Sequence, residues 1–276
     1  MGVRINFINP FGTPAYNGLI TETLEPYLNE GNELVVTNVE NCPENCDWWY
    51  PKHLTEEVLF ECIIDAEKKG FDAVIVGCCN DPGVRAAREL VDIPVVGTLE
   101  ATMQHASYFG HDYLLVTDHR KSAAYMRDLV RLYGQSEQCK DVRYINWYIT
   151  DMINDYEGVA KDALAASTKA MEDGGVESVI LACTIISACT EKWLLTSGEP
   201  RNTTILNPNT FALKMAESLG ILHQKGAYGI SRVGYYEKMQ QRRPEEFVQV
   251  REKYGRSTRF KESPNKSRLC ENRLTT

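Results

Sequence analysis

The chain has 276 residues, of which 43% are hydrophobic and 25% are charged, and its formal net charge is −8. These proportions are typical of a soluble globular protein with one large or two small domains. No stretch approaches the roughly 18 uninterrupted apolar residues that a membrane span requires. The N-terminus lacks the charged and apolar regions of a secretory signal, so we expect a cytoplasmic protein with no membrane partner.

Predicted strands and helices alternate along the chain. Apolar runs predict strands at Arg4–Ile8, Glu33–Val39, Ile93–Val96, Tyr113–Thr117, Val142–Ile145 and Thr204–Leu206, and within the segments Phe71–Cys79 and Val176–Thr184. Between and after them the pattern predicts helices at Asn17–Tyr27, Leu54–Lys69, Asp81–Leu90, Glu100–Phe109, Lys121–Tyr133, Tyr156–Glu172, a short one through Trp193, and Thr210–Leu219. In the third of these, Asp81 is the expected N-cap and Pro82 the first helical residue. This alternation predicts parallel sheets with right-handed crossovers.

Two of the predicted strands repeat one another. Phe71–Cys79 reads FDAVIVGCC and Val176–Thr184 reads VESVILACT, so both run through a β-branched stretch to a small residue and then a cysteine. The repeat predicts an α/β fold of two pseudo-symmetric, doubly wound parallel-sheet lobes with a cleft between them. We place the first lobe at residues 1–99 plus about 208–222 and the second at 100–207, followed by a C-terminal extension at 223–276.

The repeated strands end on Cys78 and Cys183, which we take as the candidate catalytic residues. Ligands of open α/β sheets bind at the carboxyl ends of the strands, and a pseudo-twofold axis would bring the two thiols face to face. A helix N-terminus favours a thiolate, and its free N–H groups can bind a developing enolate oxygen. Two thiols on opposite sides of one cleft suggest proton transfer between the two faces of a carbon atom.

Several motifs resemble those of the Asp/Glu/hydantoin racemase superfamily, and within it the hydantoin racemase branch. The matching stretches are Ile8–Pro10, Gly77–Glu89, Pro94–Ala101, Val116–Thr117 with Ser122, and Val179–Cys183. Counted back from Asp81-Pro82-Gly83, the first catalytic cysteine of the family falls on Cys78. The resemblance implies a racemase without cofactor or metal, in which one cysteine thiolate removes the α-proton and the other cysteine returns a proton to the opposite face. A 5-substituted hydantoin is the implied substrate.

The same resemblance suggests the residues that would bind the substrate. Its oxygen atoms would meet Asn9, Thr117 and the backbone N–H groups at Cys79, Asn80 and Thr184. The chain departs from the family's pattern at Cys79, which replaces a frequent aromatic residue, and at Asp118, which replaces a frequent threonine. Thr184-Ile185-Ile186 also stands where Ala-Gly-Met is common. His119, in a loop at a strand end, is the one histidine that we consider a candidate helper.

Other functions remain open at this stage. A maleate cis–trans isomerase-like enzyme also keeps both cysteines, uses one as a nucleophile, and would suit a small polar pocket. A pocket lined by Phe11, Tyr16 and Trp147 would instead favour a hydantoin. Three other classes are disfavoured by the sequence. Arylmalonate decarboxylase-like members keep only the second cysteine, whereas this chain has both. A thiol hydrolase would need a base beside its cysteine, and a non-catalytic binding module would have lost one cysteine of the pair.

The C-terminal extension is basic. From Lys225 onward it carries 13 Lys+Arg against 6 Asp+Glu, a balance of +7, whereas the rest of the chain sums to −15. Because neither an interleaved aromatic ladder nor a nucleic-acid motif supports nucleic-acid binding, we interpret it as a segment that lies on the acidic body of its own or a neighbouring subunit. We thus predict a homo-oligomer that binds a small-molecule substrate and no nucleic acid.

Overall fold

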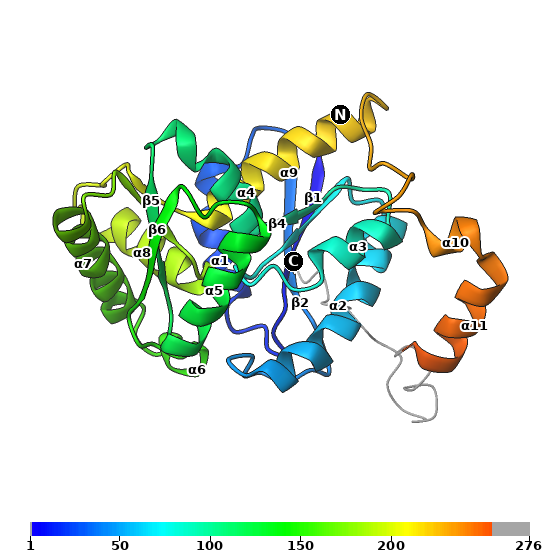
Figure 1. Ribbon diagram of the computed structural model, residues 1–276, viewed down its shortest axis with the longest axis horizontal. Helices are drawn as coiled ribbons and strands as arrows, with labels where there is room; N and C mark the ends of the chain where they lie inside the picture. The colour runs from blue at the N-terminus through cyan, green and yellow to red at the C-terminus, as the bar shows by residue number, and fades with distance from the viewer. Residues whose placement is uncertain (1, 256–276) are drawn as a thin grey trace.

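The computed structural model describes residues 2–255, and in that part of the chain eight strands form two four-stranded parallel sheets (Figure 1). The order of strands in the first sheet is β2-β1-β3-β4, and in the second it is β6-β5-β7-β8. The first sheet consists of β1 (Arg4–Asn9), β2 (Glu33–Asn38), β3 (Ala73–Val76) and β4 (Val95–Gly97). The second consists of β5 (Tyr113–Thr117), β6 (Cys139–Tyr144), β7 (Ser178–Leu181) and β8 (Ile205–Leu206).

Helices cover both faces of the first sheet. They are α1 (Asn17–Leu24) with the 3-10 turn η1 (Glu25–Tyr27), α2 (Trp49–Lys68), α3 (Val84–Leu90) and α9 (Pro208–Gln224). Successive residues of a strand point to opposite faces. Ile5 and Phe7 of β1 therefore pack with α1 and α9, whereas Ile8 packs with α2 and α3. The sheet is apolar on both sides because both sides are covered.

The second sheet is covered in the same way. Its helices are α4 (Thr98–His105) with the 3-10 turn η2 (Ala106–Tyr108), α5 (Arg120–Leu132), α6 (Ile149–Met152), α7 (Tyr156–Gly174) and α8 (Thr184–Ser197). Leu114 and Val116 of β5 pack with α7 and α8, and Leu115 packs with α4 and α5. The core on the α1 side of the first lobe continues into the core around α8, so one apolar cluster joins the two lobes.

The two lobes repeat each other in detail, which confirms the predicted fold class. Each has the same strand order, with the second lobe's strands four places later in the chain. The backbone after the repeated strands makes matching hydrogen bonds. Cys78 N–H donates to the Val76 carbonyl at 2.8 Å, and Cys183 N–H donates to the Leu181 carbonyl at 2.7 Å. The sequence repeat is thus a repeat of backbone geometry.

Helix α9 returns the chain from the second lobe to the first. It follows β8 of the second sheet, yet it packs on β1, β3 and β4 of the first sheet (Figure 1). At Gly220 a Cβ atom would lie 2.5 Å from the side chain of Val3, the residue before β1, so this turn of α9 approaches Val3 more closely than any larger residue would permit. The two lobes are therefore joined by more than one crossing of the chain.

Two predicted helix starts are wrong. Helix α2 begins at Trp49 rather than Leu54, because Pro51 fits in a first helical turn, where no N–H is needed. Helix α3 begins at Val84, and Asp81 is not its N-cap. Asp81 and Gly83 instead have φ values of 45° and 65°, which are not helical, so the helix cannot begin before Val84. The Asp81 side chain accepts a hydrogen bond from the Leu99 N–H of α4.

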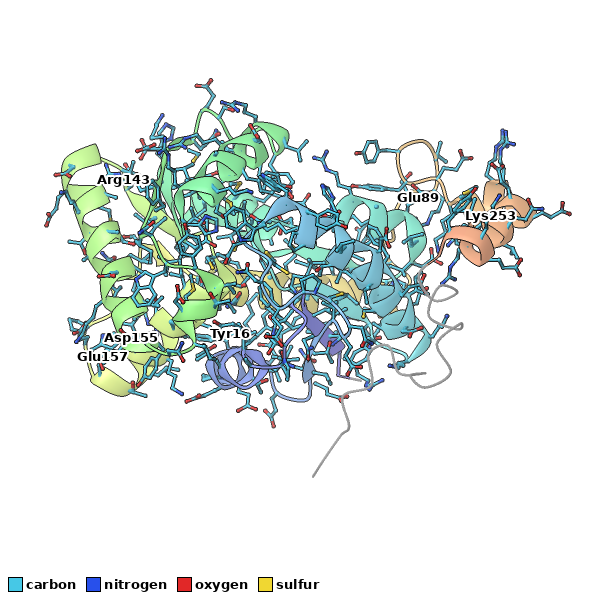
Figure 2. All side chains as sticks on the ribbon, turned by 90° about the horizontal axis from the view of Figure 1, so that it is seen from below. Tyr16, Glu89, Arg143, Asp155, Glu157 and Lys253 are labelled. Carbon is cyan, nitrogen blue, oxygen red and sulfur yellow. The ribbon has the colours of Figure 1, made fainter. Side chains whose placement is uncertain are left out.

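The described part of the C-terminal extension lies against the first lobe. It contains α10 (Met239–Arg242) and α11 (Pro244–Tyr254), which Pro244 separates, since proline cannot continue a helix from the preceding residues. Lys238 binds Asp92 at 2.7 Å, and Arg251 binds Glu61 of α2. Figure 2 places Lys253 of α11 at the end of the molecule opposite Arg143 of the second lobe. Residues 256–276 of the predicted extension lie outside the described residues. Among residues 2–255, no helix combines the length and apolar character needed to cross a bilayer.

Candidate active site

A cavity lies between the lobes at the carboxyl ends of the central strands. About 570 Å³ of space free of protein atoms lies within it and at its opening, the open solvent there included. Its wall consists of Pro10, Phe11, Cys46, Asp47, Lys52, Thr55, Cys78, Cys79, Asn80, Pro82, Asp118, Ser122, Met126, Ile149, Ala182, Cys183 and Thr184. Both lobes contribute to the wall, so the cavity exists only when the two sheets are assembled.

The two predicted catalytic cysteines lie in this wall. Cys78 comes two residues after β3 and is partly exposed, and Cys183 comes two residues after β7 and is 8% exposed. Cys183 is also the N-cap residue of α8, so the first N–H groups of that helix are close to its sulfur. The structure thus brings the two thiols, 105 positions apart in the sequence, to one cavity.

Burial keeps both thiols protonated near neutral pH. It raises the pKa of Cys78 to about 12, an effect that the positive charge of Lys52 opposes and the negative charge of Asp118 reinforces. Burial likewise raises the pKa of Cys183 well above its usual value, with Asp118 adding to the rise and the backbone N–H of Ile186 opposing it. A thiolate at either position is therefore a high-energy and strongly basic species.

Three of the predicted substrate-binding residues lie in the wall beside the cysteines. Asn80 is 7% exposed, and its side-chain Oδ1 has no hydrogen-bond partner among the described residues. Thr184 donates its hydroxyl to the Gly77 carbonyl at 3.0 Å, which links the two cysteine loops across the lobes. Cys79 accepts a weak hydrogen bond from Thr98 at 3.6 Å and is buried. Their backbone N–H groups remain our candidates for binding a substrate oxygen.

Asn9 and Thr117 are fully buried behind the wall that the described residues form. The Asn9 side-chain NH₂ donates to Asn17 Oδ1 at 2.8 Å. The Thr117 hydroxyl lies 3.0 Å from both the Ala182 carbonyl and Asp118 Oδ1. The Thr117 hydroxyl and the Asn9 NH₂ therefore already have partners within the protein, whereas Asn9 Oδ1 is buried and has no hydrogen-bond partner among the described residues. A role for either side chain in binding the substrate stays a prediction.

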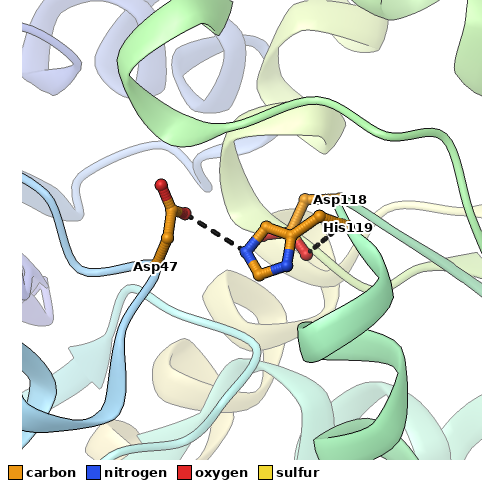
Figure 3. A group of neighbouring side chains, drawn as sticks. All are labelled: Asp47, Asp118 and His119. Atoms are coloured by element: carbon orange, nitrogen blue, oxygen red, sulfur yellow. Dashed lines mark hydrogen bonds and ion pairs between the residues drawn. The ribbon is translucent and has the colours of Figure 1, made fainter.

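An acidic pair and a histidine meet at one side of the cavity (Figure 3). His119 Nδ1 accepts a hydrogen bond from the Ser122 N–H at 3.3 Å, so the neutral ring carries its proton on Nε2. That nitrogen lies 3.4 Å from Asp47 Oδ1, and Asp118 Oδ1 accepts the His119 backbone N–H at 2.8 Å. Nε2 thus offers its proton to Asp47 and has no lone pair free for a metal ion.

A family model described as Asp/Glu/Hydantoin racemase matches residues 5–216, a range that includes both cysteines and the whole cavity wall. The chain belongs to this family. Hydantoin racemases from Rhizobium meliloti and from Pseudomonas sp. (strain NS671) are each 25% identical to it, over 85% and 92% of this chain and 94% and 98% of theirs. The allantoin racemase from Klebsiella pneumoniae has a TM-score of 0.75 at 23% identity, covering 86% of this chain and 94% of that one. The maleate isomerase Iso from Pseudomonas putida S16 has a TM-score of 0.56 at 12% identity, covering 82% and 94%.

The cavity of this racemase is less aromatic than the pocket lined by Phe11, Tyr16 and Trp147 that would favour a hydantoin. Phe11 is in the wall, but Tyr16 directs its hydroxyl to the Ile149 carbonyl, and Trp147 donates its ring N–H to Asp162 at 2.8 Å. The described wall is therefore apolar mainly through aliphatic groups and sulfur. Of the three aromatic residues expected to line a hydantoin pocket, the described wall therefore includes only Phe11.

Sequence reasoning missed two charged residues of the wall, Asp47 and Lys52. Both come from the segment at 41–52, which is rich in proline, cysteine and tryptophan and in which the sequence predicts neither a strand nor a catalytic motif. In this segment Asp47 and Lys52 stand among proline, cysteine and tryptophan residues with no helical or strand periodicity, so the sequence does not indicate that they face a cavity. Asp118, which departs from the family's pattern, and His119, the candidate helper, lie together beside Asp47 in the structure.

Proposed function

We propose that this racemase interconverts the enantiomers of a 5-substituted hydantoin without a cofactor, using Cys78 and Cys183 as acid and base. The observation that carries the proposal is the equivalence of the two cysteines. They follow corresponding strands of the two lobes with matching backbone hydrogen bonds, and both lie in the wall of one cavity. Bases on two sides of one ligand are what inversion at a carbon atom requires.

The reaction is a balanced exchange of protons. The thiolate of one cysteine takes the proton from C5 and becomes a thiol, and the electron pair moves into the ring to form an enolate. The thiol of the other cysteine gives its proton to the opposite face of C5 and becomes a thiolate. We assign the hydrogen bonds to the enolate oxygen to the backbone N–H groups of Asn80 and Thr184, two residues of the cavity wall, and the N-terminus of α8 favours that negative charge.

The raised thiol pKa values suit this chemistry. A carbon acid is weak, so its proton goes more readily to a strongly basic thiolate than to an ordinary one. The cost is that few molecules hold the thiolate at neutral pH, and Lys52 offsets part of that cost at Cys78. The proposal therefore expects activity that increases with pH.

The charges of the wall favour a neutral ring over a dicarboxylate. Asp47 and Asp118 present two carboxylates against the single ammonium of Lys52. A doubly negative maleate would be repelled at this short range, whereas the N–H groups of an uncharged hydantoin can donate to the carboxylates. Hydantoin racemases among the relatives and allantoin racemases among the similar structures agree with this preference, since allantoin is a hydantoin with a carbamoylamino substituent.

The test follows optical rotation and C5–H exchange of enantiopure hydantoins in D₂O, corrected for the buffer rate. Allantoin, a 5-alkyl hydantoin and maleate form the panel. Cys78→Ser and Cys183→Ser should each lower racemisation at least about 10³-fold, because an alcohol is a far weaker acid than a thiol. Cys139→Ser, at a buried thiol outside the cavity, is the matched control and should retain activity. Full activity in either cavity variant would refute the two-cysteine mechanism.

A further inference from the structure

One segment of the first lobe closes the cavity against the second lobe. We call Cys46–Lys52 the lid segment; it runs into the first turn of α2. The Trp49 ring packs edge-on against Tyr125 of α5 with 4.7 Å between centroids, and the Lys121 ammonium lies 4.8 Å from the Trp48 ring. These contacts hold the lid segment across the two lobes, with Asp47 and Lys52 in the cavity wall.

Within the lid segment, Asp47 is a buried carboxylate with one oxygen left over. The residue is 5% exposed, and its Oδ1 faces the Nε2–H of His119. Its Oδ2 is buried and has no hydrogen-bond partner among the described residues. A buried carboxylate oxygen without a donor costs free energy, so its presence in a cavity wall points to a donor on the ligand.

His119 holds this carboxylate in place. Its tautomer is set by the Ser122 N–H, and its ring stacks on Tyr148 with 4.9 Å between centroids. Because Oδ1 is occupied by Nε2–H, Oδ2 is the atom of Asp47 that lacks a hydrogen-bond partner among the described residues. His119 therefore acts as a positioning residue for Asp47.

Lys52 supplies the complementary group on the same segment. Its ammonium lies 5.2 Å from the Trp49 ring centroid, and the residue is in the cavity wall. An acceptor at Asp47 and a donor at Lys52, in the wall of one cavity, are by chemical type the partners that the N–H and C=O groups of a urea unit need.

We propose that Asp47 and Lys52 recognise a ureide: Oδ2 of Asp47 accepts a substrate N–H, and the Lys52 ammonium donates to the adjacent carbonyl. This inference rests on the proposed function, because it assigns the residues that select the substrate of the same site. The shared chemistry has two sources, the hydantoin ring itself or a carbamoylamino substituent at C5. In both, Asp47 determines specificity and does not exchange the C5 proton.

The experiment compares wild type and Asp47→Asn on allantoin, on a 5-alkyl hydantoin, and on their N-methylated derivatives. In Asp47→Asn the amide oxygen still accepts from His119, so its NH₂ replaces Oδ2 and meets the substrate N–H donor to donor. We expect kcat/KM to fall roughly 100-fold for substrates that keep the recognised N–H, and less than about threefold for those in which a methyl group replaces it. Asp151→Asn, at an exposed carboxylate of α6, is the matched control and should change neither value.

The outcomes separate the two proposals and the two sources. Wild type that racemises no hydantoin defeats the proposed function itself. Loss confined to allantoin assigns the substituent, and loss on both N–H substrates assigns the ring. An equal loss on N–H and N-methyl substrates, or no loss on any, overturns the ureide assignment while leaving the cysteine mechanism intact. Should Asp47→Asn fail to fold, the N–H versus N-methyl preference of wild type alone decides, since equal kcat/KM for both would also overturn it.

Discussion

Asp81 holds the loop of the first cysteine to two helices, and its replacement is the sharpest test of how this site is assembled. Its carboxylate accepts hydrogen bonds from the Leu99 and Glu100 N–H groups, at 3.1 and 2.8 Å, and from the Tyr133 hydroxyl at 2.9 Å. Gly97 makes room for it, since a Cβ there would lie 2.7 Å from the carboxylate carbon. One buried side chain thus caps α4 and fixes α5.

The structure sets the size of the effect. In Asp81→Ala the lost cap of α4 costs about 1–2 kcal/mol, and the stranded Tyr133 hydroxyl costs a further 1–2 kcal/mol or so. The backbone at this position has φ 45°, where alanine is less favourable than Asp or Asn by about 1 kcal/mol. We therefore expect Asp81→Ala to lower the free energy of unfolding by about 3–5 kcal/mol. Asp81→Asn keeps the backbone tolerance and one acceptor oxygen, so its expected cost is about 1–2 kcal/mol.

Urea unfolding followed by circular dichroism measures these differences, and racemisation measured on the same samples reports on the cysteine loop. Asp128→Ala is the control, because that carboxylate pairs with Arg131 at 2.8 Å on the surface with 68% of its side chain exposed. Its expected cost is below about 0.5 kcal/mol. If Asp81→Ala stays within about 1 kcal/mol of this control, or if Asn is as damaging as Ala, the reasoning about the cap and the backbone fails.

Three further outcomes are expected. Thr184→Val removes the hydroxyl that bonds to the Gly77 carbonyl between the lobes, so it should lower the free energy of unfolding by about 1–2 kcal/mol; no change in the urea midpoint would contradict this. Lys52→Met removes the charge that lowers the pKa of Cys78, so the pH dependence of its alkylation by iodoacetamide should move to higher pH, whereas Lys52→Arg should leave it in place. Arg232→Ala breaks the contacts of the extension with the end of α3, and limited proteolysis should then cleave near residue 232 without loss of racemisation; unchanged protease resistance would show that other contacts suffice.

The alternation of strands and helices was predictable because buried parallel strands and amphipathic helices have their own residue patterns. The repeat of FDAVIVGCC in VESVILACT predicted equivalent backbone positions for Cys78 and Cys183, and the structure places both in one cavity wall. Helix starts were less predictable. At Asp81 the local pattern indicated an N-cap, but contacts with α4 and α5, distant in the sequence, compete for the same carboxylate.

By itself the sequence determined the two-lobed α/β fold, the family, and the strand ends that carry the thiols, because these depend on short-range patterns and on an internal repeat. Only the tertiary structure decided which other groups share the cavity. Asp47 meets His119 because the lid segment crosses from one lobe to the other, and no spacing along the chain encodes that contact. The same assembly removes Cys78 from most of the solvent, so desolvation raises the pKa of its thiol while the nearby charge of Lys52 lowers it. Such effects depend on distances between residues far apart in sequence, which exist only in the folded chain.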